Sequence, residues 1–455
     1  MSQITQYPIA DSALRWLEII LTERFGAKWH LSRIEPGLRL ELDGAEGSII
    51  FDVMSDNFIQ AHSDQPCTQW DAESEGWHSV LGGPLPAPGF SNLPAPLIES
   101  HNTEHVIHYD ILGLCYWMLA RVEEVGRTDL DSHQRFQASS SHAFRHNYLE
   151  RPIVDEWLYI LKQTMMRQWP GIQPKKQEFR IRTSHDVDRP FQYLHQSPGS
   201  IARQVFGDTL KRKNLGLAWN RLMAWKAVRQ GDLHRDPFYT LDWLMDISEK
   251  NSLVSAFYFI CGRTDARLDS YYGIELPSVR ALLRKVYQRG HEIGLHPSYN
   301  TYQNPAALAA EADLLRRVCE EEGIPLAKIG GRMHYLRWEQ PSTFHCLVAA
   351  GVSYDSTLGY PDCAGFRCGT CFAYPAFDVR TGESLELRVR PLIAMEQSVF
   401  GEAGLGLSLE DGLVHLKALK QHCRAVGGSF NLLWHNSELH NYDLKNLYIK
   451  LIQDN

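Results

Sequence analysis

The stretch RTSHDVDRP, residues 182–190, places a histidine and two aspartates within four positions, directly after the alternating run EFRIRT (178–183). Alternation of apolar and polar residues predicts a β-strand, so Asp186 and Asp188 fall where that strand ends. Two carboxylates this close repel each other, and a bound cation is a common remedy. An isolated pair of aspartates often only caps a turn, so a cation site can be inferred here only with support from the rest of the chain.

Beyond this stretch, strand-like segments alternate with helical ones. This alternation is typical of parallel βα units and predicts an α/β fold, with a barrel as the expected arrangement. In such barrels the catalytic side chains sit at the carboxyl ends of the strands, and the polar clusters of this chain fall there repeatedly. The later strand-like segments are LVSAFYFI (253–260), HEIGLH (291–296), VSYDST (352–357) and SFNLLWH (429–435).

The first part of the chain reads as mixed α/β and carries no catalytic cluster. SALRWLEIILTERF (12–25) predicts a helix, SIIFDVM (48–54) a strand, and the Pro/Gly-rich run LGGPLPAPGFSNLPAP (81–96) a loop. Because 455 residues exceed one ordinary domain, we place a border at PGIQPKK (170–176). We therefore predict a smaller mixed α/β accessory domain over residues 1–175 and a catalytic α/β domain over residues 176–455.

Composition narrows the class of protein. Hydrophobic residues make up 44% of the chain, yet no run approaches the roughly 18 apolar residues of a membrane-spanning helix. The first residues do not read as a signal peptide, and nine scattered cysteines are typical of buried thiols in a reducing compartment. A net charge of −8 argues against nucleic acid as a partner. These features predict a cytoplasmic protein.

A basic segment of about residues 199–235 interrupts the alternation. Its apolar residues recur at helical spacing among cationic ones, which predicts a basic helical insertion. A solvated helix face is one interpretation, and contact with an anionic substrate or a membrane surface is the other. The cationic residues are Arg203, Lys211, Lys213, Arg221, Lys226 and Arg229.

Three further polar clusters occur along the chain, and two of them lie at the ends of predicted strands. RGHEIGLHPSYN (289–300) delivers His296 at a strand end, and a helix beginning at Pro297 would put Asn300 on the same face. GGRMHYLRW (330–338) contains Arg332 and His334, and NLLWHNS (431–437) contains Trp434 and His435. Imidazole and carboxylate are standard zinc ligands, an arginine can hold a carboxylate ionised, and a histidine transfers protons near neutral pH. Each residue alone also fits a structural role.

The order of these motifs resembles the polysaccharide deacetylases of carbohydrate esterase family four, over about residue 176 to the end. RTSHDVD, GHEIGLHPSYN, GGRMHY, GVSYDST and NLLWH carry the resemblance. It implies a distorted (β/α) barrel of the polysaccharide deacetylase type and a metal-dependent N-deacetylase. It also assigns roles: Asp186 as general base, Asp188 and His296 as metal ligands, Arg332 as the partner of the base, and His435 as general acid.

The chain departs from that family pattern in the second and third motifs. The second-motif ligand that is commonly histidine falls on Asn300, a neutral and harder donor; alternatively His185 or His334 completes the metal shell. The usual proline-containing third motif is replaced by RMHY. Glu396 is a weak candidate for orienting His435. As substrate-binding residues we predict Trp434, Tyr299, His334 and Arg367; the last lies in DCAGFRCGTC (362–371), whose cysteines we interpret as structural thiols.

The resulting prediction is a hydrolase that uses a divalent metal, with Zn²⁺ expected, to remove an N-acetyl group from an amino sugar. The expected substrate is a cytoplasmic, phosphate-linked precursor of a surface polysaccharide, with the basic insertion near its phosphates. Peripheral membrane contact is the other use considered for that insertion. Two alternatives stay open: a catalytically weakened carbohydrate-binding or scaffold protein, and an amidohydrolase acting on a non-sugar amide.

Overall fold

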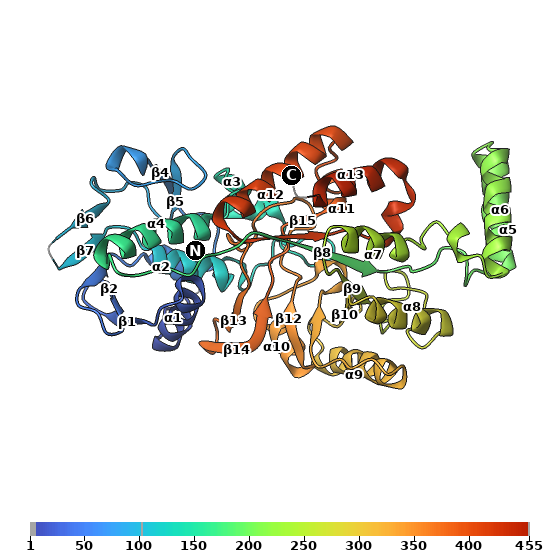
Figure 1. The fold of residues 1–455 in the computed structure, drawn as a ribbon, viewed down its shortest axis with the longest axis horizontal. Coiled ribbons are helices and arrows are strands. Elements are labelled where there is room, and N and C mark those ends of the chain that lie inside the picture. The colour runs from blue at the N-terminus through green and yellow to red at the C-terminus, as the bar shows by residue number, and fades with distance from the viewer. Residues whose placement is uncertain (1–5, 102, 454–455) are drawn as a thin grey trace.

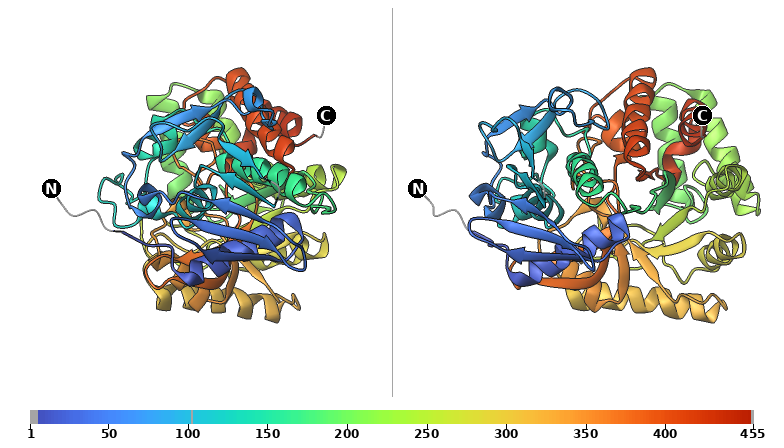
Figure 2. Two further views of the ribbon diagram at one scale, coloured as in Figure 1. Left: turned by 90° about the vertical axis from the view of Figure 1, so that its left-hand side faces the viewer. Right: turned by 60° about the vertical axis from the view of Figure 1, so that its left-hand side comes forward.

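The N-terminal part of the computed structural model is built on a five-stranded sheet. The structure describes residues 6–101 and 103–453. The sheet has the order β1-β2-β3-β7-β6, and within it only β3 and β7 run parallel. Helices α1 and α4 pack against this sheet (Figure 2). Every residue of α2 is buried. The bounds are α1 Asp11–Phe25, β1 Trp29–Arg33, β2 Leu38–Leu42, β3 Ser48–Phe51, β6 Ile98–Ser100, β7 Glu104–Ile107, α2 Ile111–Leu119 and α4 Ile153–Gln168.

A second, smaller pairing joins β4 (Cys67–Trp70) and β5 (Leu85–Pro88) antiparallel. Trp157 of α4 donates its indole N–H to the carbonyl of Pro86 at 2.8 Å and stacks on Trp70. The Pro/Gly-rich run at residues 81–96 therefore contributes a strand, although the sequence predicts a loop there. Its backbone is held by side chains of a distant helix, a contact that local composition does not reveal.

The C-terminal part is a nine-stranded sheet curled into a half-barrel (Figure 1). Its order is β13-β14-β12-β11-β10-β9-β8-β16-β15, and all neighbours run parallel except β13 and β14. The predicted fold class, α/β with a distorted (β/α) barrel preceded by a smaller mixed α/β domain, is confirmed. The strand bounds are β8 Arg180–Val187, β9 Ala256–Phe259, β10 Glu292–Leu295, β11 Ile329–Gly331, β12 Val352–Asp355, β13 Tyr374–Asp378, β14 Glu383–Val389, β15 Ala394–Met395 and β16 Ser429–Leu433.

Helices follow most of these strands, as expected for βα units. They are α7 Leu241–Lys250, α8 Pro277–Gln288, α9 Pro305–Glu321, α10 Ser342–Ala349, α11 Glu396–Phe400, α12 Leu409–Val426 and α13 Tyr442–Ile452. Inside the sheet, Gly330 lies so close to Tyr354 that a Cβ would meet that ring at 1.9 Å. The phenol of Tyr354 instead reaches that of Tyr258 at 3.0 Å. Glycine at this position lets neighbouring strands carry tyrosines into the half-barrel.

The two parts share a buried polar interface. Arg367, from the loop between β12 and β13, donates to the carboxylate of Glu124 in the N-terminal part. Arg121 donates to the same carboxylate at 2.7 Å, and all three side chains are at most 3% exposed. The domain border predicted near residue 175 falls between the end of α4 at Gln168 and the start of β8 at Arg180.

One helical hairpin extends from the half-barrel at the end opposite the N-terminal part (Figure 1). It comprises α5 (Pro198–Phe206), a π-helical turn (Gly207–Lys211) and α6 (Leu215–Arg229), in the segment predicted to be a basic helical insertion. Within the part of the chain that the structure describes, no helix has the length and apolar character needed to span a membrane.

Candidate active site

The residues predicted from the strand ends meet at one edge of the sheet. Asp186 and Asp188 lie at the end of β8, and His296 directly follows β10. Arg332 directly follows β11, and His435 lies two residues after β16. Because β16, β8, β9, β10 and β11 are consecutive parallel neighbours, their carboxyl ends share one edge and bring these side chains together.

Three of the side chains form a group that could hold a metal ion. Asp188, His296 and His334 each offer one ligand atom, and these atoms lie within 4.8 Å of one another. The Nε2 atoms of His296 and His334 lie 3.3 and 3.6 Å from Oδ1 of Asp188. That oxygen is buried and has no hydrogen-bond partner among the described residues. A buried, unpartnered carboxylate oxygen facing two imidazoles is the environment that a cation would satisfy.

The orientation of both imidazoles fits a metal site. Nδ1 of His296 contacts the carbonyl oxygen of Arg332 at 2.5 Å, and Nδ1 of His334 contacts Oδ1 of Asp269 at 2.9 Å. In the neutral ring, a proton on Nδ1 leaves Nε2 as the lone-pair donor, and such outer partners commonly fix metal-binding histidines. Burial raises the pKa of Asp188, but the nearby imidazoles, His334 foremost, outweigh burial and hold it well below its usual range.

Asp186 lies beside this group and is held by Arg332. The Arg332 guanidinium donates to Oδ1 of Asp186 at 2.9 Å, and Oδ2 faces Nε2 of His296 at 3.7 Å. Arg332 also donates to Ser184 and Ser356, and it is 1% exposed. Burial lowers the pKa of Arg332, but the negative charge of Asp186 raises it above its ordinary value, so the arginine stays charged. One carboxylate oxygen of Asp186 is thus engaged and the other faces the site.

His435, from the neighbouring strand β16, also lies beside this group. Its Nδ1 lies 2.5 Å from Oε1 of Glu396, the first residue after β15, and its Nε2 lies 3.8 Å from Oδ2 of Asp188. Burial lowers the pKa of His435, but Glu396 and the two aspartates raise it to about 10. At neutral pH the ring is therefore an imidazolium that can donate a proton from Nε2. The weak sequence candidate Glu396 is placed as the carboxylate that orients this histidine.

These groups open into a cavity of about 1190 Å³ that both parts of the chain line. Asp131, His133 and Arg135 of the N-terminal part form one wall, facing Tyr335 of the third motif. The Arg135 guanidinium donates to the carbonyl oxygen of Tyr335 at 3.0 Å. Tyr335 itself has a left-handed backbone, with φ of 62°. The N-terminal domain is therefore part of the site, although its sequence predicts no catalytic cluster.

Asn300 lies away from the expected ligand position. No helix begins at Pro297: residues 299 and 300 form a turn, and α9 starts only at Pro305. The Asn300 amide is exposed, donates to the carbonyl of Thr264 at 3.2 Å and accepts from Arg337 at 3.1 Å. The structure therefore does not place Asn300 in the candidate metal group. His334, the alternative that also stood as a substrate-binding candidate, is the third member of that group.

The other predicted substrate-binding residues lie outside the cavity lining. Trp434 is fully buried against Phe400 and Tyr448, so its ring cannot stack on a sugar. Tyr299 lies under the Arg337 guanidinium, and its hydroxyl contacts His133 at 2.9 Å. Arg367 is buried in the domain interface with Glu124 and cannot contact substrate.

The remaining sequence candidates have structural surroundings. His185 is fully buried, and its ring packs against Phe257 and Tyr448 while Nδ1 contacts the carbonyl oxygen of Trp434 at 2.8 Å, so it does not belong to the candidate metal group. Cys363, Cys368 and Cys371 are buried free thiols, which agrees with their interpretation as structural. The basic segment 199–235 contributes no residue to the cavity lining, so its predicted place near substrate phosphates is not reproduced.

Several cavity residues escape the sequence reading. Asp269 holds His334 yet belongs to no strand-end motif, and Tyr271, 74% exposed, lines the cavity from the same loop. Arg189 and Arg267 are exposed on the lining as well. For the N-terminal wall of the cavity, the sequence contains one signal. It is the dense polar run RTDLDSHQR (127–135), which is unusual for a simple linker.

Comparison with known family models matches only part of the chain. Residues 43–170 match the model of a family described as a family of unknown function, DUF7033. The comparison with curated protein sequences finds no match. Polysaccharide deacetylases are among the solved structures that resemble the chain.

Three solved structures illustrate the likeness. A protein of Mycobacterium smegmatis described as a polysaccharide deacetylase shares 18% identity at a TM-score of 0.38, over 62% of this chain and 84% of its own. Puue allantoinase shares 12% identity at 0.37, over 62% and 85%. A protein of Pseudomonas aeruginosa PAO1 described as a probable polysaccharide deacetylase shares 12% at 0.34, over 61% and 83%.

Proposed function

We propose that this protein is a metal-dependent amide hydrolase that removes the N-acetyl group from an amino sugar. One observation carries the proposal: a candidate ligand group of Asp188, His296 and His334 lies beside a base, Asp186, and an acid, His435. A metal group with both a carboxylate and an imidazolium next to it is suited to hydrolysis of a carbonyl compound.

The residues divide the reaction between them. A divalent cation such as Zn²⁺, when held by Asp188, His296 and His334, would polarise the amide carbonyl and lower the pKa of water toward about 7. Asp186, oriented by Arg332, accepts the proton of the attacking water. The C–N bond then breaks, and the Nε2 proton of His435 passes to the departing amine. The products are acetate and a free amino sugar.

The lining of the cavity supports a sugar substrate. Aromatic rings of Tyr271, Tyr335 and Phe400 line it together with carboxylates and arginines, the combination that packs a sugar face and binds its hydroxyls. The exposed guanidiniums of Arg189 and Arg267 would suit an anionic group on that substrate. A cytoplasmic precursor of a surface polysaccharide stays a prediction from the sequence.

The two alternative functions are weakened to different degrees. The binding-protein alternative rested on Asn300 and the altered third motif, and a candidate group in which His334, from that motif, is the third ligand weakens it. The non-sugar amidohydrolase uses the same residues and differs only in substrate. A panel of amides, including N-acetylated oligosaccharides, a sugar nucleotide with an acetamido group and a cyclic ureide, separates the two.

The direct test is acetate release by the zinc-loaded protein from N-acetylated sugars. We expect turnover by the wild type, a loss of at least about a hundredfold in Asp186→Asn, and near-normal turnover in Asn300→Ala. Turnover only of non-sugar amides would overturn the sugar assignment. Absence of turnover on every amide, with metal bound, would overturn the hydrolase itself.

A further inference from the structure

Helix α6 is apolar on two faces, and only one of them is covered. Val228 packs with Tyr193 and Ile201 in a small core of its own, joined by the partly buried Trp225. Leu215, Trp219, Leu222 and Met223 are 71%, 63%, 37% and 45% exposed. They recur at the three- and four-residue spacing that places side chains on one helix face. The hairpin therefore presents an apolar stripe that none of the residues described by the structure covers.

The rest of the hairpin repeats this pattern. On the continuous helical run before α6, Phe206 and Leu210 are four residues apart and 62% and 59% exposed. Together with Leu217, the hairpin holds seven of the seventeen exposed large hydrophobic side chains among the described residues. A concentration of this kind in one short segment marks an interaction surface, since scattered exposed apolar residues need no partner.

Positive charge borders the apolar stripe at both ends. Residues 198–235 contain eight lysines and arginines against two aspartates, although the whole chain has a net charge of −8. One aspartate, Asp208, is fully buried between the guanidiniums of Arg212 and Arg221, so it contributes little to the surface. Exposed Lys211 and Lys213 lie at the hairpin tip, and exposed Lys226 and Arg229 follow Met223 on the stripe.

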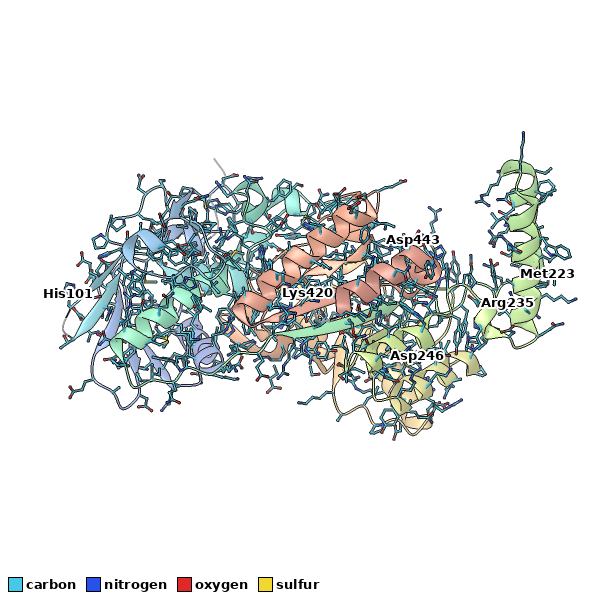
Figure 3. The ribbon with its side chains drawn as sticks, turned by 45° about the horizontal axis from the view of Figure 1, so that its top comes forward. His101, Met223, Arg235, Asp246, Lys420 and Asp443 are labelled. Carbon is cyan, nitrogen blue, oxygen red and sulfur yellow. The ribbon has the colours of Figure 1, made fainter. Side chains whose placement is uncertain are left out.

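The shape of the molecule leaves this surface accessible. The hairpin stands apart from the half-barrel (Figure 1), and Met223 lies on it well away from the body in Figure 3. Helices α5 and α6 pack mainly on each other. If the hairpin served only the fold, its apolar stripe would be buried. We therefore interpret the stripe as a surface that binds a partner outside the chain.

We propose that the α5–α6 hairpin docks the protein on an anionic lipid bilayer. A helix with Trp, Leu and Met on one face and Lys and Arg at its borders matches the interfacial helices that lie in the headgroup region. The long cationic side chains can reach lipid phosphates while the apolar rings enter the acyl boundary. A two-fold pairing of hairpins would bring two basic segments together, so charge favours the bilayer over a second copy. The inference goes beyond the hydrolase and does not depend on it.

Vesicle co-sedimentation of the full chain tests this proposal. We expect the wild type to bind vesicles of phosphatidylcholine mixed with phosphatidylglycerol, to bind pure phosphatidylcholine weakly, and to lose binding as salt rises. Leu215→Ser with Trp219→Ser should weaken binding at least about tenfold, and so should Lys211→Glu with Lys213→Glu. Val414→Ser removes an equally exposed apolar side chain from α12 and should change nothing.

Two results would overturn the proposal. One is a wild type that stays in the supernatant with anionic vesicles at low salt. The other is vesicle binding that all four hairpin substitutions leave intact, because the lipid contact would then lie elsewhere. If the hairpin substitutions instead convert a dimer into a monomer in sedimentation analysis without affecting vesicles, a second copy is the occupant. Unchanged thermal unfolding of each variant shows that the fold survives these exposed substitutions.

Discussion

Nδ1 of His334 lies 2.9 Å from Oδ1 of Asp269, and this contact turns Nε2 of the same ring toward Asp188. The same Oδ1 also accepts the backbone N–H of Tyr299, and Oδ2 accepts the N–H groups of Thr264 and Asp265. Asp269 thus ties the third ligand to the loop that borders the cavity. Its role is positioning, because it acts on the candidate metal group through the ring of His334.

The first prediction concerns that contact. Asp269→Asn should weaken zinc affinity about 10- to 100-fold, since outer partners of metal-binding histidines contribute at that level. Competition with a chromogenic chelator measures the change. Asp265→Asn alters a carboxylate in the same loop that does not contact His334, and it should leave affinity within about twofold. Equal affinity in wild type and Asp269→Asn would contradict the assigned role of His334.

The second prediction concerns the pH dependence of turnover. Glu396 is the main cause that raises the pKa of His435 to about 10 against burial. A group with a raised pKa keeps its proton until pH approaches that value, so Glu396→Gln should move the alkaline limb of kcat/KM to lower pH and lower kcat. Glu402→Gln, in the same cavity, should keep the wild-type profile. An alkaline limb that does not move would remove His435 as the acid.

The third prediction concerns stability and Glu311. Burial raises the pKa of this carboxyl to about 7, although the backbone and hydroxyl of Ser298 donate to it. Because the fold disfavours the charged form, stability falls as pH rises from about 4.5 to about 7 and does not recover above. Glu311→Gln cannot ionise, so its stability relative to wild type should rise by up to about 3 kcal/mol across that window.

Chemical denaturation at several pH values measures this difference. Glu320→Gln, an exposed neighbour on α9, should follow the wild type throughout. If the free energies of unfolding of Glu311→Gln and wild type changed equally with pH, the Glu311 carboxyl would ionise as readily in the folded protein as in the unfolded chain, and the prediction would be wrong.

The fourth prediction separates a structural role from substrate binding at Arg367. Arg367→Met leaves the buried carboxylate of Glu124 with one cation in place of two, which should cost about 3–5 kcal/mol of unfolding free energy. Arg388→Met breaks a half-buried pair with Glu23 and should cost about 0–1 kcal/mol. The KM of the folded fraction of Arg367→Met should equal that of the wild type. A raised KM with normal stability would restore the substrate-binding role predicted from the sequence.

The sequence predicts those parts of the site that depend on strand ends. Asp186, Asp188, His296 and His435 directly follow or close apolar strands, and parallel pairing is enough to bring such positions together. Asn300 is misplaced because its prediction assumed a helix after Pro297. The Asp269 carboxylate and the Thr264 hydroxyl hold the intervening backbone in a turn instead.

Contacts between distant segments account for what the sequence does not predict. The left-handed backbone at Tyr335 and the docking of Arg135 on its carbonyl place His334 and the N-terminal wall, and neither leaves a local pattern. Trp434 is a residue for which the sequence predicts a role that the structure does not support. An aromatic residue at a strand end could stack on a sugar or pack in the core, and only the tertiary structure shows that Trp434 is buried.

Metal content of the purified protein by elemental analysis tests the central claim most directly. After reconstitution with zinc, we expect about one ion per chain in wild type and in Asn300→Ala, and loss of that ion in His334→Ala and in His296→Ala. Retention of zinc by His334→Ala together with its loss from Asn300→Ala would contradict the ligand group. No bound zinc in the wild type would contradict the metal-dependent hydrolase as a whole.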